Sequence, residues 1–184
     1  YLSTGEFNYF GSTVMPGPQL KEAIPFSKKI KQDFPEVKII WGGYFASNQH
    51  KVSLESRYVD YIVNGPGDHS FPSLLDAIEN KEWEKIPSIK NLIFLDEKGK
   101  VVKTAKDTLP KMDELPPLPY DYLNEFYPIK NYLGKTFMGN KTLSYHSSFG
   151  CPFTCSFCAV VPIYNAKWKG FSALGEFVST TAQV

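Results

Sequence analysis

The sequence predicts an α/β fold: a parallel sheet with covering helices, followed by the start of a second unit. Three observations lead to this prediction. Strand-like apolar runs alternate with helically spaced apolar residues over 8–80. A proline-rich stretch at 107–120 then interrupts the pattern. The only three cysteines of the chain lie within 151–158, directly after another strand-like run. An apolar content of 42% is enough for a real core.

The first strand and helix are expected near the N-terminus. "NYFGSTVM" at 8–15 is rich in β-branched and aromatic residues and ends at a Pro-Gly-Pro sequence. Residues 18–34 place their apolar side chains at helical spacing, and a proline suits the first turn of this helix. Pro25 lies inside it and predicts a kink or a late start.

The same alternation continues to residue 80. Strands are expected at 37–41 and 59–63, with a polar stretch of short helical character between them. A turn then leads to a helix at 70–80, for which Asp68 or Ser70 is the expected N-terminal cap. Strands and helices in alternation indicate a parallel sheet with covering helices.

A hairpin and a connector complete the expected organisation. Two short strands flank Glu97-Lys98-Gly99 within 91–105, which is typical of an antiparallel edge hairpin. Four prolines within 107–120 indicate an extended connector. We therefore expect an α/β domain at 1–106, a connector at 107–141 and the start of a second domain at 142–184.

Charge and hydropathy argue against several classes of protein. The net charge of +1 gives no overall field that would recruit nucleic acid or an anionic membrane. Arg57 is the only arginine among 20 basic residues, which disfavours reading of guanine edges. No apolar run reaches about 18 residues, so we expect no transmembrane segment. An odd number of clustered cysteines favours a reducing compartment, the cytoplasm, over a disulfide framework.

Cys151, Cys155 and Cys158 have the spacing CxxxCxxC. A tight loop has too little interior to bury three inert thiols, and a disulfide would leave one thiol over. A zinc site usually takes four ligands, for which His146 is the only nearby candidate. Three thiolates suit an iron–sulfur cluster that keeps one iron open to a small molecule. The spacing favours this cluster over a zinc site or an inert loop.

The stretch "CPFTCSFC" resembles the signature loop of the radical S-adenosylmethionine superfamily, down to Phe157 before the last cysteine. The resemblance implies that the three cysteines ligate a 4Fe–4S cluster, which cleaves S-adenosylmethionine reductively for radical chemistry on a small-molecule substrate. It implies that Phe157 packs near the adenine and that a donor such as flavodoxin or ferredoxin supplies the electron. It also implies that the loop follows the first strand of a partial β/α barrel, expected at 141–148.

The upstream half resembles a cobalamin-binding domain. "STVM" and "WGG" end two successive strands with 42 − 14 − 1 = 27 residues between Val14 and Gly42, similar to the Ser-x-Leu … Gly-Gly pattern of that family. The resemblance implies a flavodoxin-like, doubly wound parallel sheet. Ser12, Val14, Gly42, Gly43 and Gly65 would then line the slot for the nucleotide tail of cobalamin. Read alone, a Gly-Gly pair after a strand is often only a tight turn.

Together the two halves resemble the cobalamin-dependent radical S-adenosylmethionine enzymes, many of which are methyltransferases. Pro66 and Asp68 depart from the family, which commonly has glutamates there. Only 184 − 158 = 26 residues follow Cys158, whereas one βα unit of a barrel takes about 30. We therefore expect a catalytically incompetent portion of a longer enzyme, with the N-terminal part of the cobalamin-binding domain missing. The alternatives are a radical enzyme whose N-terminal domain does not bind cobalamin, and a non-catalytic iron–sulfur or zinc protein.

Overall fold

The computed structural model describes residues 2–109, 111–116, 119–131, 133–137, 139–142, 148–164 and 168–170. The chain divides into two compact units, which are Tyr1–Leu109 with Gly150–Lys167, and Pro110–Phe149 with Trp168–Val184. The first unit therefore holds both the sheet and the cysteine loop.

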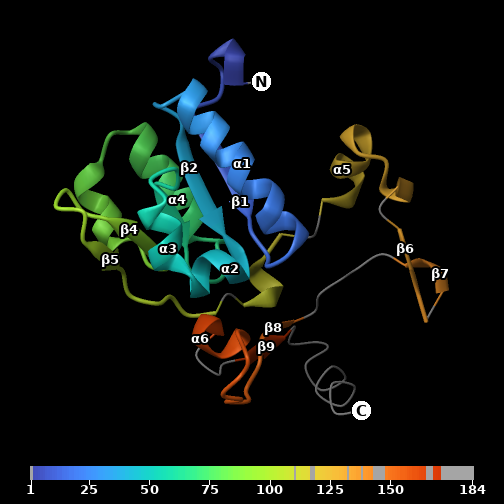
Figure 1. The fold of residues 1–184 in the computed structure, drawn as a ribbon. Coiled ribbons are helices and arrows are strands. Elements are labelled where there is room, and N and C mark those ends of the chain that lie inside the picture. The colour runs from blue at the N-terminus through green and yellow to red at the C-terminus, as the bar shows by residue number, and fades with distance from the viewer. Residues whose placement is uncertain are drawn as a thin grey trace. The chain divides into compact units, whose positions relative to one another are not determined.

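A five-stranded sheet forms the centre of the first unit (Figure 1). Its strands follow one another in chain order: β1 (Tyr9–Thr13), β2 (Lys38–Gly42), β3 (Tyr61–Val63), β4 (Leu92–Leu95) and β5 (Val101–Lys103). The first three strands pair in parallel, whereas β4 and β5 join as an antiparallel hairpin. The predicted α/β class and the predicted edge hairpin are both confirmed, and the sheet is mixed.

Helices cover both faces of this sheet. The first face carries α1 (Pro18–Asp33), α2 (Gly43–Asn48) and α3 (His50–Glu55), and the second carries α4 (Ser70–Glu79) and the 3₁₀ segment η2 (Trp83–Ser88). Ile39 and Trp41 of β2 join the core under α1–α3, whereas Ile40 joins the core under α4. This alternation follows the two-residue period of a strand, and it gives each face its own apolar layer.

Two details of the helices differ from the sequence prediction. Helix α1 begins at Pro18, so the late start that Pro25 suggested was wrong, and this proline is accommodated inside the helix. Neither Asp68 nor Ser70 caps α4: His69 takes the cap position, and no side chain caps the helix. The Phe71 N–H donates a hydrogen bond to the Gly67 carbonyl at 2.9 Å, so a backbone oxygen satisfies one of the N–H groups that a capping side chain was expected to satisfy.

The remaining elements are short. They are η1 (Leu2–Thr4), η3 (Met112–Glu114), α5 (Tyr120–Phe126), η4 (Ile129–Asn131), the antiparallel pair β6 (Gly134–Thr136) and β7 (Gly139–Thr142), the pair β8 (Ser148–Gly150) and β9 (Trp168–Gly170), and α6 (Val160–Tyr164). The strand expected at 141–148 falls mostly on 143–147, which lie outside the described residues. Within the described ranges, no helix has the length and apolar character that a membrane crossing requires.

A buried polar contact joins α1 to β2. The indole N–H of Trp41 donates a hydrogen bond to the Ser27 hydroxyl oxygen at 3.0 Å. Trp41 is 1% exposed and Ser27 is 0% exposed, so neither group can find water instead. A buried indole N–H needs an acceptor, and Ser27 therefore fixes how α1 sits on the sheet.

We predict that Ser27→Ala lowers the free energy of unfolding by about 1–3 kcal/mol, because the buried Trp41 N–H loses the hydroxyl that accepts its hydrogen bond. Urea denaturation followed by circular dichroism measures this change. Ser73→Ala is the matched control, since the Ser73 hydroxyl is exposed and bonds the carbonyl of His69 within the same turn of helix. Equal losses in the two variants would contradict the structural role of Ser27.

Candidate functional site

A groove of about 530 Å³ opens at the carboxyl ends of β1, β2 and β3, where the first turn of α4 forms one wall. Ligand sites of open α/β sheets occupy this edge. The lining comes from the three strand ends, the turn after β3 and the start of α4: Gly11, Ser12, Thr13, Ile40, Gly42, Gly43, Val63, Gly65, Gly67, Asp68, Phe71 and Pro72.

Four of the five residues predicted to line a cobalamin slot do line this groove. They are Ser12, Gly42, Gly43 and Gly65. The parallel register explains why two of the strands contribute, since Ser12 lies opposite Trp41 and Thr13 lies opposite Gly42. The structure thus brings together residues that lie far apart in the sequence.

Val14, the fifth predicted residue, does not line the groove. Its side chain is fully buried in the core under α1–α3. Its backbone nevertheless shapes the groove's edge: the Val14 N–H donates to the Gly42 carbonyl at 2.9 Å, and the Val14 carbonyl accepts from the Phe45 N–H at 3.0 Å. These bonds hold the ends of β1 and β2 and the start of α2 together.

The two adjacent glycines have different roles. Gly43 has φ +83°, a left-handed conformation, and a Cβ there would lie 2.9 Å from Thr13 Cγ2 and 3.0 Å from the Val14 carbonyl oxygen. Gly42 has an extended backbone with φ −132°, and a Cβ there would meet nothing closer than the Val63 carbonyl oxygen at 3.9 Å. Gly43 is therefore required by the backbone, whereas Gly42 keeps the groove wall bare.

Sequence reasoning missed part of the lining. A Cβ at Gly11 would lie 3.2 Å from Phe71 Cζ, so the bare backbone of β1 allows the first turn of α4 to approach. Gly11 pairs with Ile40 and Thr13 pairs with Gly42. By the two-residue period of a strand, Gly11 and Thr13 share the face of β1 opposite to Ser12, so the predicted Ser12 did not point to them.

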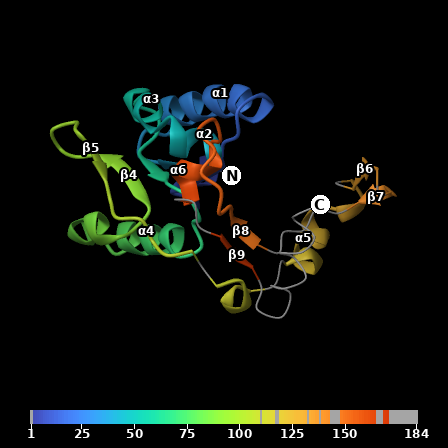
Figure 2. The same ribbon diagram turned by 90° about the horizontal axis from the view of Figure 1, so that it is seen from below.

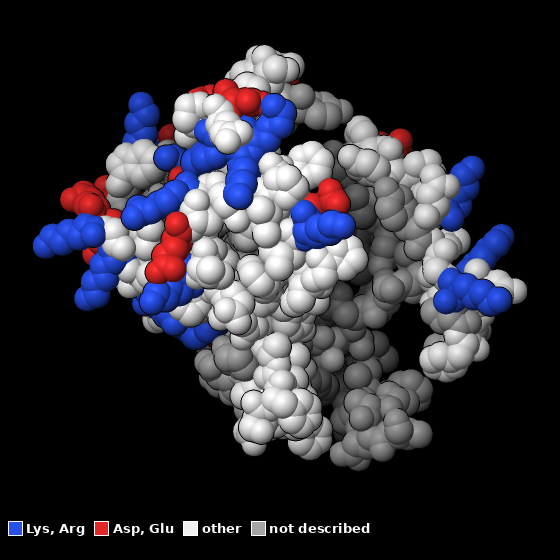
Figure 3. Space-filling view, in the orientation of Figure 1, with Lys and Arg blue, Asp and Glu red and all other residues white. Residues whose placement is uncertain are grey.

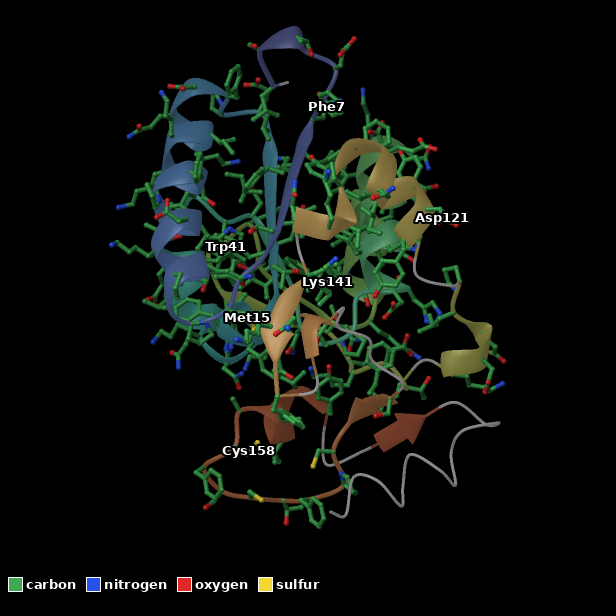
Figure 4. The ribbon with its side chains drawn as sticks, turned by 90° about the vertical axis from the view of Figure 1, so that its right-hand side faces the viewer. Phe7, Met15, Trp41, Asp121, Lys141 and Cys158 are labelled. Carbon is green, nitrogen blue, oxygen red and sulfur yellow. The ribbon has the colours of Figure 1, made fainter. Side chains whose placement is uncertain are left out.

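The cysteine loop runs from the end of β8 to the start of α6. Cys151 and Cys158 are half-buried, Cys155 is exposed, and all three thiols are free. The Cys158 N–H donates to the Cys155 carbonyl at 3.1 Å, which forms a turn before α6. Phe157 is 91% exposed. Figure 4 shows Cys158 in this loop, whose backbone curves away from the sheet.

The loop and α6 form an uncharged part of the surface. Residues 148–164 contain no lysine, arginine, aspartate or glutamate. On the face shown in Figure 3, side chains of both charges are interspersed over the α/β part, whereas the surface lower in the view is uncharged where it is described.

The donor set suits an iron–sulfur cluster in its chemistry, since three free thiols lie in one short loop. Within the described part of the chain, however, no three His, Cys, Asp or Glu side chains are gathered closely enough to hold a metal ion. His146, the candidate fourth ligand of a zinc site, lies outside the described residues.

Known proteins show similarity to this chain, although no protein-family model matches it. The chain is 31% identical over 137 residues to the anaerobic magnesium-protoporphyrin IX monomethyl ester cyclase of Cereibacter sphaeroides, covering 73% of this chain and 20% of the cyclase. It is 27% identical over 158 residues to the hopanoid C-3 methylase of Methylococcus capsulatus, covering 82% of this chain and 27% of the methylase.

Solved structures share the fold. One of them is OxsB, a cobalamin-dependent S-adenosylmethionine radical enzyme solved with aqua-cobalamin bound. The two structures superpose with a TM-score of 0.69 at 20% sequence identity, and the match covers 98% of this chain and 24% of OxsB. The chain therefore shares its fold with enzymes that are cobalamin-dependent and use radical S-adenosylmethionine chemistry. A second solved structure is the radical S-adenosylmethionine methyltransferase TsrM from Kitasatospora setae, with cobalamin and a [4Fe–4S] cluster bound. Its TM-score is 0.60 at 18% sequence identity, and the match covers 96% of this chain and 35% of TsrM.

The chain spans about a fifth to a quarter of the length of the curated relatives it matches, the cyclase and the methylase. This part of the chain contains both the glycine-lined groove and the cysteine loop.

We predict that Gly43→Ala destabilises the protein by about 1–3 kcal/mol, because alanine must adopt a left-handed backbone and its Cβ meets the end of β1. Thermal unfolding followed by circular dichroism measures the loss. Gly42→Ala is the control and should change stability by less than about 1 kcal/mol, since its extended backbone suits alanine. A larger loss in Gly42→Ala than in Gly43→Ala would show that the junction is not built as described.

Proposed function

We propose that this chain carries the cobalamin groove and the cluster loop of a cobalamin-dependent radical S-adenosylmethionine enzyme. The reaction is methyl transfer or a related radical modification of a small molecule. One observation carries the proposal: a glycine-lined groove at a strand edge and a loop of three free cysteines lie in one compact unit. The similarity to a cyclase and to a methylase supports the same class of reaction.

The groove suits the nucleotide tail of cobalamin. Gly42 carries no side chain at the end of β2, so a flat group can lie directly against the strand backbone there. Val63 and Phe71 add apolar surface suited to an aromatic base. When bound, cobalamin supplies methyl-transfer chemistry, and the role of these residues is to hold and orient its tail.

The cysteine loop would hold the 4Fe–4S cluster through Cys151, Cys155 and Cys158. When bound, such a cluster supplies one-electron reduction of S-adenosylmethionine, with flavodoxin or ferredoxin as the electron donor. Phe157 is exposed and therefore free to pack against the adenine. Three unpaired thiols are stable in a reducing compartment such as the cytoplasm.

The proposal extends to the finer architecture. The α/β unit would be the C-terminal part of a flavodoxin-like, doubly wound domain within 1–106, and 107–141 would connect it to the radical domain that begins at 142. Strand β8 would be the first strand of a partial β/α barrel. Its position supports this, because β8 ends at Gly150 and Cys151 follows directly.

We predict that Gly42→Val weakens binding of aquacobalamin at least about tenfold, because a Cβ at Gly42 has room in the protein and the added side chain takes up part of the groove. Gly43→Val would not test this cleanly, since its strain alters the strand ends themselves. Spectrophotometric titration of this chain measures the affinity.

Gly134→Val is the control for an added valine, since nothing lies within 4 Å of a Cβ at Gly134. Normal binding by Gly42→Val would reject this groove as the site. Absence of binding by the wild type would favour a radical enzyme that does not use cobalamin.

We predict that anaerobic reconstitution with iron and sulfide loads about four irons per chain. Replacing any one of the three cysteines by alanine should abolish this loading, because a cluster with one open iron already uses all three thiolates. Iron and sulfide analysis and electron paramagnetic resonance measure the cluster. Ser156→Ala, in the same loop, should load normally. Uptake of one zinc with no iron would favour the structural zinc alternative.

A further inference from the structure

We propose that Lys106 is a positioning residue, which fixes the helix after the cysteine loop against the turn that lines the groove. It would thereby set the position of the cysteine loop relative to the groove. The consequence for two cofactors rests on the proposed function, whereas the contacts themselves do not.

Lys106 bridges two backbone carbonyls from distant parts of the first unit. Its Nζ donates to the Asn64 carbonyl at 2.6 Å and to the Ile163 carbonyl at 3.3 Å. Asn64 is the first residue after β3, and Ile163 lies in the last turn of α6. An ammonium group has three donors, so one side chain can satisfy both acceptors at once.

The turn after β3 is in contact with the groove and with α6. Gly65 lines the groove. A Cβ at Gly65 would lie 3.5 Å from the Ile163 carbonyl oxygen and 3.5 Å from Lys106 Nζ. The end of α6 and the ammonium group therefore lie against the same residue that forms part of the groove wall.

The other contacts of α6 hold it to a different element. The Asn48 side-chain amide of α2 donates to the Ala159 carbonyl at 3.4 Å, and Figures 1 and 2 both place α6 beside α2. The Ile163 side chain is buried. These contacts attach α6 to the protein, and Lys106 adds a polar link from α6 to the groove turn.

The chemistry of Lys106 suits this link. Burial, with a smaller contribution from the positive charge of Lys103, lowers the pKa of Lys106 to about 8. The side chain is therefore still mostly protonated at pH 7. A cation is favoured at the C-terminal end of a helix, where the last carbonyls lack partners within the helix.

Hydrogen exchange of this chain without any cofactor tests the link. In Lys106→Met, exchange of the peptides covering 61–68 and 158–164 should rise about tenfold, the factor expected from loss of one charge-assisted hydrogen bond. Lys106→Arg keeps the charge and the donors and should restore at least half of the protection. Lys90→Met is the matched control, because Lys90 pairs with Asp107 and not with α6.

Unchanged exchange at 158–164 in Lys106→Met, or an equal rise in Lys90→Met, would overturn the inference. If Lys106→Met does not fold, Lys106→Gln is compared with Lys106→Arg instead. Only the glutamine variant should then lose protection from hydrogen exchange.

A second measurement adds aquacobalamin. Slower exchange in both peptides of the wild type, with the effect at 158–164 lost in Lys106→Met, would support coupling through Lys106. An effect at 158–164 that persists in Lys106→Met would reject it. If the wild type does not bind aquacobalamin, the proposed function fails, and the cofactor-free comparison still decides the role of Lys106.

Discussion

The junction between β2 and α2 is the constraint on which the groove depends. Helix α2 begins at Gly43, directly after the strand, and this is possible only because the backbone turns there with φ +83°. The turn brings the Phe45 N–H to the Val14 carbonyl, while the Val14 N–H bonds the Gly42 carbonyl. Two strands and a helix therefore end or begin at one place with no intervening loop. The groove lies at this edge of the sheet, where Thr13, Gly42 and Gly43 line it.

Local patterns predicted the elements well because each has a strong period of its own. The strands around residues 10, 40 and 62, the helices around 26 and 75 and the edge hairpin all follow from alternation, helical spacing and turn residues. The resemblance to a cobalamin-binding pattern, rather than periodicity, placed Ser12, Gly42, Gly43 and Gly65 at one site, and all four line the groove. Val14, which the same resemblance named, lies one residue beyond β1 and has its side chain buried in the core instead.

Long-range contacts account for most of what the sequence could not predict. Phe71 approaches Gly11 across the face of the sheet, and Asn48 reaches Ala159 over a separation of 111 residues. Neither contact leaves a periodic pattern in the sequence, because each depends on how two separate elements pack against each other. The cap of α4 was wrong for a related reason: the carbonyl of Gly67 serves as an acceptor, so the sequence position of a polar side chain does not mark the cap.

Helix α6 belongs to the first unit although it follows most of the second unit in the chain, and this affects the order in which the parts of the first unit are synthesised. Ile163 follows Lys106 by 57 residues, which is about 3–11 s of translation at roughly 5–20 residues per second. All five strands of the sheet lie before Lys106 and leave the ribosome first. The seat for α6, formed by Asn48, the turn at Gly65 and Lys106, is then open while the second unit is still being made.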